Sequence, residues 1–312
     1  MHGNKKLSTV VIILILILSS LLLSEILLSG LLHITTMTMS EIYDFYNNGA
    51  EIGRLERGLG IVEFHRTKEI LSRYIDSGKV IYDIGGGIGM YAAWLAKKGN
   101  EVHLIELAEN AVEYAKENMM LDCQFIAETG NALQVNRPDE SADVVLLMGP
   151  QYHLRDKVER LQSLREAFRV LKKGGLLVAV GISKFSSMTW ALSVYGEKKN
   201  ASLMEFLDDP VFFNMIQGEM TTGNHIRPAE YPRFIAESYF TTSDEMKSEI
   251  TEAGFAVEKA IAVEGCIWFT PHLAEKWEDE ASRERLLDIV RITESEPEMM
   301  GMSPHFLVVA RK

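Results

Sequence analysis

The chain has few of the residues that build disulfide frameworks or metal sites. Only two of its 312 residues are cysteines, Cys123 and Cys266, and neither belongs to a C-x-x-C pair. Its eight histidines are scattered along the sequence without the spacing of metal ligands. We therefore expect neither a disulfide framework nor a bound metal ion.

Positive charge is also scarce. Lysine and arginine number 32 against 44 acidic residues, which gives a net charge of −12, and no basic run occurs. Proteins that bind nucleic acids gain much of their affinity by neutralising phosphates with lysine and arginine. We therefore expect no nucleic-acid partner. The hydrophobic content of 47% suffices for a sizeable core, and the length suits one large domain with an insertion.

Glycine, by contrast, is concentrated in one stretch, "VIYDIGGGIGMYAAWLAKKGNEVHLIEL" (80–107). The pattern predicts a strand over 80–82, a helix over 90–98 and a second strand over 101–107. A strand–loop–helix–strand unit of this kind implies a parallel pair joined by a right-handed crossover. Because glycine has no Cβ atom, backbone N–H groups and the helix start can approach a ligand closely.

Three kinds of ligand compete for this loop. A triphosphate loop would end in Gly-Lys-Ser/Thr, which is missing. A dinucleotide pattern G-x-G-x-x-A can be matched with Gly87, Gly89 and Ala92, but it is weak by itself. The pattern D-x-G-x-G-x-G, which begins at Asp83, accounts for more residues, and Glu106 lies at the end of the next strand. A carboxylate there can accept both hydroxyl protons of an adenosine ribose.

The stretch resembles motif I and the following acidic position of class I S-adenosylmethionine-dependent methyltransferases. Five further segments resemble later parts of that family in the same order: 130–135, 141–154, 164–180, 241–255 and 303–312. Segment 130–135 corresponds to the adenine-facing loop, and 141–154 to the fourth strand and its loop. Segment 164–180 corresponds to a helix, a Gly-Gly turn and the fifth strand. Segments 241–255 and 303–312 correspond to a late helix and the final strand. The resemblance spans about 40–312 with a gap at 183–240. It implies a doubly wound, mostly parallel seven-stranded α/β sheet with an antiparallel C-terminal strand.

The same resemblance implies S-adenosylmethionine as cofactor and methyl transfer by in-line displacement to an N, O, S or C atom of a small-molecule acceptor. Two alternatives stay open, an NAD(P)-binding oxidoreductase and a non-catalytic S-adenosylmethionine-binding module. The positions that the resemblance assigns to the cofactor are Asp83, Gly85, Gly87, Gly89, Glu106, Leu107, Asn131, Ala132 and Met148.

The loop after the fourth strand, "MGPQYH" (148–153), supplies the candidate catalytic residues Tyr152 and His153. It lacks the Asn or Asp of the N-P-P-Y and D-P-P-Y sequences, which argues against exocyclic-amine methylation and aminopropyl transfer. His153 would suit a general base because its ordinary pKa lies near neutral pH. A substrate-lining role and a structural role for His153 are the competing interpretations.

Two flanking regions complete the expected domain. In 41–76, Tyr43, Tyr46, Arg54 and Arg66 are candidates for the acceptor or the methionine carboxylate, although a structural role is favoured for each. The segment 183–240 is rich in aromatic residues and too long for an ordinary connection, so it predicts a helical lid after the fifth strand. Its aromatics fit either an apolar acceptor or a hydrophobic core of the lid, with His225 and Arg227 as polar candidates.

The apolar N-terminal segment (1–36) allows two interpretations. Between Leu7 and Ile34 it carries one charge, Glu25, and its composition favours membrane insertion by roughly 4–8 kcal/mol. Lys5 and Lys6 would then keep the N-terminus cytoplasmic and place the domain outside, where S-adenosylmethionine should be scarce. Either the enzyme is anchored in the orientation opposite to the one that these lysines favour, or translation begins at Met37 or Met39. We expect a cytoplasmic catalytic domain and leave the oligomeric state open.

Overall fold

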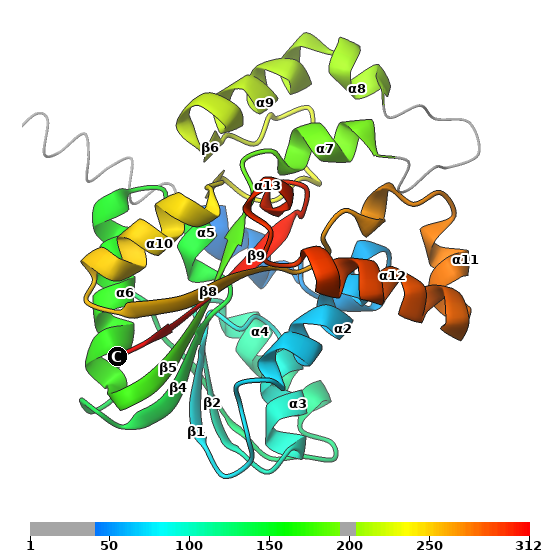
Figure 1. Ribbon diagram of the computed structural model, residues 1–312. Helices are drawn as coiled ribbons and strands as arrows, with labels where there is room; N and C mark the ends of the chain where they lie inside the picture. The colour runs from blue at the N-terminus through cyan, green and yellow to red at the C-terminus, as the bar shows by residue number, and fades with distance from the viewer. Residues whose placement is uncertain (1–40, 194–203) are drawn as a thin grey trace, which may run out of the picture. The chain divides into compact units, whose positions relative to one another are not determined.

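A seven-stranded mixed sheet lies at the centre of the computed structural model, which describes residues 41–193 and 204–312 (Figure 1). Its strands run in the order β3-β2-β1-β4-β5-β9-β8. β1 to β5 are parallel, and β9 is antiparallel to both of its neighbours. The predicted sheet is confirmed. The strand bounds are Val80–Ile84 (β1), Glu101–Glu106 (β2), Ile126–Thr129 (β3), Ala142–Leu147 (β4), Leu171–Ile182 (β5), Ala256–Ala262 (β8) and His305–Arg311 (β9).

Helices cover both faces of the sheet (Figure 1). Successive side chains of a strand point to opposite faces, so Val145 and Leu146 enter different apolar layers. Leu146 packs in the layer formed with α2 and α3, and Val145 packs in the layer formed with α6 and α10. The helix bounds are Leu59–Leu71 (α2), Met90–Lys97 (α3), Glu109–Tyr114 (α4, continued by a π-helical turn over Ala115–Met119), Lys157–Val170 (α6) and Ser243–Glu252 (α10).

The glycine pair of the fifth strand departs from the expected turn. Gly174 and Gly175 lie inside β5, where the pairing with β4 shifts between Ala142–Leu171 and Val144–Leu176. Gly174 has a φ of 75°, which side chains rarely adopt. The pair therefore forms an irregularity within one strand instead of a turn before it.

The segment 183–240, called the inserted segment below, contains helices as expected and also a short antiparallel strand pair. Residues 194–203 lie outside the described residues. Figure 1 shows the helices α7, α8 and α9 grouped together. Its elements are Ser186–Leu192 (α7), Met204–Asp208 (α8), Pro210–Thr222 (α9), Asn224–His225 (β6) and Ser238–Tyr239 (β7).

A second insertion, residues 264–304 between β8 and β9, was not predicted. The resemblance indicated no helix between the late helix (241–255) and the final strand (303–312). The insertion packs an apolar cluster around Trp268 and Leu287 against Val62 of α2. Its elements are Ile267–Phe269 (a 3-10 turn), Leu273–Glu278 (α11), Glu280–Thr293 (α12) and Pro297–Met300 (α13).

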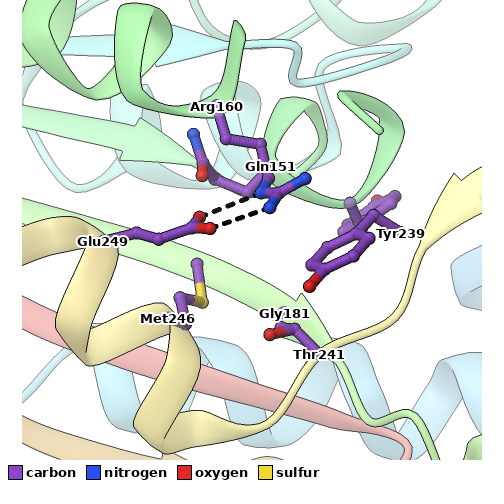
Figure 2. A pocket seen from close by; sticks show the side chains of 8 residues that line it. Gln151, Arg160, Gly181, Tyr239, Thr241, Met246 and Glu249 are labelled. Carbon is purple, nitrogen blue, oxygen red and sulfur yellow. Dashed lines mark hydrogen bonds and ion pairs between the residues drawn. The ribbon is translucent and has the colours of Figure 1, made fainter. Parts of the chain in front are cut away.

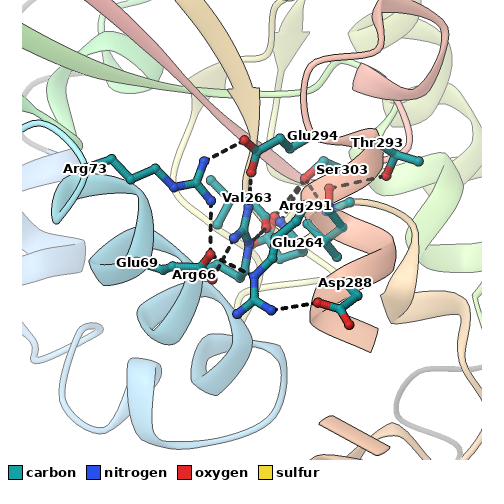
Figure 3. A network of polar contacts seen from close by, with 12 residues as sticks. Arg66, Glu69, Arg73, Val263, Glu264, Asp288, Arg291, Thr293, Glu294 and Ser303 are labelled. Carbon is teal, nitrogen blue, oxygen red and sulfur yellow. Dashed lines mark hydrogen bonds and ion pairs between the residues drawn. The ribbon is translucent and has the colours of Figure 1, made fainter. Parts of the chain in front are cut away.

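Ion pairs also join α2 to the second insertion (Figure 3). The guanidinium of Arg66 is fully buried and donates to Glu69 and to Glu294, each at 2.7 Å. Arg73 donates to Glu294 at 2.5 Å, and Arg291 to Glu69 at 2.9 Å. Arg66 is thus held by structural partners, in agreement with the favoured interpretation.

The apolar N-terminal segment lies outside the described residues. Within the described part of the chain, no helix combines the length and apolar character that crossing a bilayer requires.

Candidate functional site

The glycine loop between β1 and α3 has a backbone that other residues would not tolerate. Gly85, Gly87 and Gly89 have φ values of 70°, 58° and 80°. A Cβ atom on Gly86 would lie 2.4 Å from Oδ2 of Asp83, inside contact distance. Such a loop leaves the backbone open to a ligand, as the sequence indicated.

Asp83 is the least satisfied polar group of this region. Its side chain is 0% exposed, and neither carboxylate oxygen has a hydrogen-bond partner among the described residues. Burial, together with the nearby charge of Glu106, raises its pKa from 3.8 to about 7. A buried carboxylate without partners is costly, so this one is suited to a ligand that brings hydrogen-bond donors or positive charge.

Glu106 ends β2 directly beside the loop. Its Oε2 accepts from the backbone N–H of Gly87 at 2.8 Å, and its Oε1 accepts from that of Ala108 at 3.0 Å. Burial nevertheless raises its pKa. Each carboxylate oxygen has a second lone pair, so Glu106 can still accept from hydroxyl groups of a ligand.

The remaining predicted cofactor positions surround the same edge of the sheet. Leu107 follows Glu106, and Asn131 and Ala132 follow β3. Met148 follows β4 and is buried in the apolar layer of α2 and α3. The amide oxygen of Asn131, which we expected to face an adenine, accepts from the backbone N–H of Leu133 at 2.9 Å. Its contact with the cofactor stays a prediction.

Residues 81–175 match the family model of a methyltransferase domain. Among curated proteins, methyltransferase GfsG of Streptomyces halstedii is 30% identical over 37% of this chain and 42% of its own length. Ribosomal protein L11 methyltransferase of Shouchella clausii is 33% identical over 41% of this chain and 40% of its own length. The chain therefore spans less than half the length of these two relatives.

Two solved structures of S-adenosylmethionine-dependent methyltransferases share the fold. The protein of Methanosarcina mazei has a TM-score of 0.52 and 19% identity, with 78% of this chain and 96% of that chain covered. The protein of Mesorhizobium loti has a TM-score of 0.51 and 16% identity, with 80% and 100% covered. This chain carries a class I S-adenosylmethionine-dependent methyltransferase domain. The predicted family and cofactor are confirmed, and the unpaired Asp83 and the open glycine loop fit that cofactor.

His153 does not have the environment of a general base in this methyltransferase domain. It lies on the short helix Pro150–His153 (α5) and is 6% exposed. Burial lowers its pKa to about 4, below the range that suits a general base at neutral pH, and the catalytic role predicted for it stays a prediction. The hydroxyl of Ser238 donates to Ala236, so it accepts from Nδ1 of His153 at 3.3 Å. Nε2 then accepts from the hydroxyl of Tyr46 at 2.5 Å.

His153 therefore joins three parts of the chain: α5, the inserted segment through Ser238, and the region before α2 through Tyr46. Burial raises the pKa of Tyr46 well above its ordinary value, so the phenol keeps its proton. Tyr46 also packs on the apolar cluster of Ile88 and Ala108, beside the glycine loop. These contacts favour the structural interpretation of His153 among those left open.

Tyr152 lies closer to the glycine loop. It is partly buried against the same apolar layer as Met148, and its ring centroid is 4.7 Å from that of His153. Burial raises its pKa, and its phenol is neutral at physiological pH. It can line an acceptor or donate a hydrogen bond, and the catalytic role assigned to it stays a prediction.

Sequence reasoning missed the acidic residues beside the loop. The side chain of Glu51 lies against Gly87, where an added Cβ would be 3.1 Å from its Cγ atom. Arg54, in the 3-10 turn Arg54–Glu56, donates to Glu51 at 2.8 Å and to both oxygens of Glu63 at 2.6 and 3.1 Å. A candidate contact of Arg54 with the methionine carboxylate would therefore compete with these two glutamates.

The aromatics of the inserted segment pack on one another. Trp190, Phe206, Phe212 and Phe234 have ring centroids within 5.0–6.4 Å of one another. This cluster favours a hydrophobic core of the segment over an acceptor-lining role. The buried His225 contacts Glu219 at 2.6 Å and stacks on Phe240, so it is engaged within the same segment. Arg227 lies over the ring of Phe45 at 5.6 Å.

A small hollow opens between β5, α5, α6 and α10 (Figure 2). Within it, Arg160 donates to both oxygens of Glu249 at 2.9 and 2.8 Å and lies over the ring of Tyr239 at 3.7 Å. The positive charge of the hollow is thus already neutralised by the protein. Its other lining residues are Gln151, Tyr152, Gly181, Thr241 and Met246.

Proposed function

We propose that this protein transfers the methyl group of S-adenosylmethionine to a small-molecule acceptor. The observation that carries the proposal is the buried, unpaired carboxylate of Asp83 beside a glycine loop, with Glu106 at the end of the next strand. Asp83 would accept from the cofactor's ammonium group, and Glu106 from the ribose hydroxyls. The predicted adenine-facing role of Asn131 and the predicted cofactor contact of Met148 complete this assignment.

When bound, the cofactor supplies a sulfonium-activated methyl group. A lone pair of the acceptor would take this methyl group by in-line displacement, with the electrons of the carbon–sulfur bond left on sulfur. Any proton on the acceptor atom would be lost to bulk solvent once the product leaves the site. The protein's part is to orient the two molecules and to exclude water. The inserted segment, which follows β5 at the carboxyl edge of the sheet, would act as the lid over the acceptor.

The small size of the acceptor is supported by charge. The chain carries a net charge of −12 and has no basic run. A chain of this charge repels phosphate backbones, which favours a small molecule over a nucleic acid.

Calorimetry on the full chain tests the proposal with S-adenosylmethionine, S-adenosylhomocysteine and NAD⁺. We expect micromolar binding of the first two ligands and none of NAD⁺. Glu106→Ala removes two charge-assisted hydrogen bonds of about 1.5–3 kcal/mol each, so affinity should fall at least tenfold. Glu109→Ala, an exposed neighbour, is the matched control and should bind normally. Binding of NAD⁺ alone would establish an oxidoreductase instead.

Turnover distinguishes an enzyme from a binding module. S-adenosylhomocysteine release would be followed with pools of small-molecule, protein and RNA acceptors. Release with small molecules alone supports the proposal, and release only with RNA or protein contradicts the acceptor class. A protein that binds S-adenosylmethionine and releases no product with any pool would be a non-catalytic module.

A further inference from the structure

Glu264 and His305 form a carboxylate–histidine pair at the two ends of the second insertion. Glu264 is 0% exposed, and its Oε1 lies 2.7 Å from Nδ1 of His305. Its Oε2 accepts from the hydroxyl of Ser303 at 3.0 Å and from the backbone N–H of His305 at 3.1 Å. Nε2 of His305 makes no hydrogen bond to any described residue, and the side chain is 21% exposed. One ring nitrogen is therefore fixed and the other is available.

The fold places this ring at the carboxyl edge of the sheet. His305 begins β9 and pairs with Ile182 at the end of β5. Leu307, two residues further along β9, lies in the apolar layer that also contains Met148 and contacts Tyr152. Since alternate residues of a strand share a face, His305 points to the same side as these two residues. That side holds the loop after β4, next to the predicted methyl-transfer site.

The groups that face the ring decide its charge. Oε2 of Glu63, from α2, lies 3.9 Å from Nδ1, and Arg54 donates to Glu63 at 2.6 Å. Tyr91 of α3 lies near the same carboxylates, and burial raises its pKa, so it is neutral. Burial lowers the pKa of His305, but Glu264 and Glu63 together raise it by more, to about 9. The ring is therefore an imidazolium at neutral pH, and Nε2 carries a hydrogen.

This cluster also brings together side chains that are far apart in the sequence. Glu63, Glu264 and His305 offer ligand-type atoms within 4.8 Å of one another, although the histidines showed no metal spacing. Here the proton of His305 and the guanidinium of Arg54 supply the positive charge that two carboxylates need. Among the residues that the structure describes, none accepts a hydrogen bond from the Nε2–H of His305.

We propose that His305 binds the acceptor by donating from Nε2–H, and that the acceptor carries an anionic or carbonyl oxygen beside the atom that is methylated. The proposal rests on the methyl transfer proposed above. An acceptor with an ammonium group at that place would be disfavoured, because its N–H groups would face the Nε2–H hydrogen of His305 and find no lone pair. Glu264 is then a positioning residue, which fixes the ring and its charge. Because the ring already holds its proton, it does not act as the base.

The test uses the full chain saturated with S-adenosylhomocysteine, with benzoate and benzylamine as probes. Both probes have an apolar ring, but benzoate presents oxygens and benzylamine an ammonium group. In ¹⁵N-histidine NMR spectra, we expect benzoate to shift the Nε2 resonance of His305 and benzylamine to leave it unchanged. His305→Gln should weaken benzoate binding at least tenfold while the affinity for S-adenosylhomocysteine changes less than twofold.

The pH dependence separates this role from a structural one. Benzoate affinity should be constant up to about pH 8 and be lost as the pH rises through the pKa of His305 near 9. In Glu264→Gln the loss should begin at lower pH, because the carboxylate that stabilises the imidazolium is gone. Trp268→Phe is the matched control. It removes the hydrogen bond that Trp268 donates to the carbonyl of Met302 at 2.8 Å within the second insertion but touches neither Glu264 nor His305, so its pH profile should match that of the wild type.

Several results would overturn the inference: no benzoate binding to the wild-type complex, equal binding of benzylamine, or equal effects of Trp268→Phe and His305→Gln. If His305→Gln does not fold, the resonance shift in the wild-type protein decides. Failure of S-adenosylhomocysteine itself to bind is a different result, which contradicts the proposed function.

Discussion

Replacing Asp83 by asparagine should stabilise the protein without its cofactor, and the gain should depend on pH. The pKa of Asp83 rises from 3.8 to about 7 because the buried carboxylate has no partner. At about 1.4 kcal/mol for each tenfold change in proton affinity, this corresponds to about 4 kcal/mol. Since the folded protein holds a proton that the unfolded chain has lost, the free energy of unfolding falls as the pH rises from about 4 to 7. Asparagine cannot ionise and avoids this loss.

Urea unfolding at pH 4.5 and pH 8 measures the effect. At pH 8, Asp83→Asn should be more stable than the wild type by about 4 kcal/mol, or about 8 °C in Tm for a chain of this size. At pH 4.5 the difference should shrink to about 1 kcal/mol or less, because most of the wild-type carboxyl groups are protonated in the folded state. Calorimetry should show weaker S-adenosylmethionine binding in the variant, since the charge that faces the ligand is lost.

Asp143, on the neighbouring strand β4, provides the opposite control. Its carboxylate accepts from the N–H of Val80 and from Lys172, each at 2.9 Å, and these contacts hold its pKa below the usual range despite partial burial. Asp143→Asn should therefore destabilise the protein, more at pH 8 than at acid pH. If Asp83→Asn is no more stable than the wild type at pH 8, the ionised carboxylate is already satisfied, and our account of the site is wrong.

Two further substitutions test the loop and the contact between α2 and the second insertion. Gly86→Ala places a Cβ atom 2.4 Å from Oδ2 of Asp83, so both Tm and S-adenosylmethionine affinity should fall; unchanged values would mean that the loop relaxes freely. Arg66→Met removes a fully buried partner of Glu294 and should lower the free energy of unfolding by about 3 kcal/mol in urea titrations. Arg73→Gln, which affects a one-third exposed partner of the same carboxylate, should cost less than about 1 kcal/mol, and equal losses would refute the argument.

The sequence was sufficient for the glycine loop and the elements around it because their causes are local, whereas the rest of the sheet was implied by the resemblance to a family. Apolar runs and glycine positions predicted β1, α3 and β2, and the structure places all three within one residue or two of the expected bounds. The positive φ values of Gly85, Gly87 and Gly89 explain why this pattern indicates a ligand-binding loop. The second insertion was missed because its helices lie between the late helix and the final strand, where the resemblance indicated none.

The chemical state of the polar groups depended on contacts that no local pattern reports. His153 was a reasonable candidate base by residue type, but Tyr46 and Ser238, from distant parts of the chain, enclose it and keep it neutral. Glu264 and His305 are 41 positions apart, and the second insertion closes between them.

The sequence by itself determined the strands and helix around the glycine loop, the position of that loop and the family it resembles, since backbone conformation and strand alternation act over a few residues. Only the tertiary structure decided which carboxylate is left unpaired, which histidine is enclosed and which keeps a free N–H. Burial and the distance between charges set these properties, and both arise when remote segments pack together.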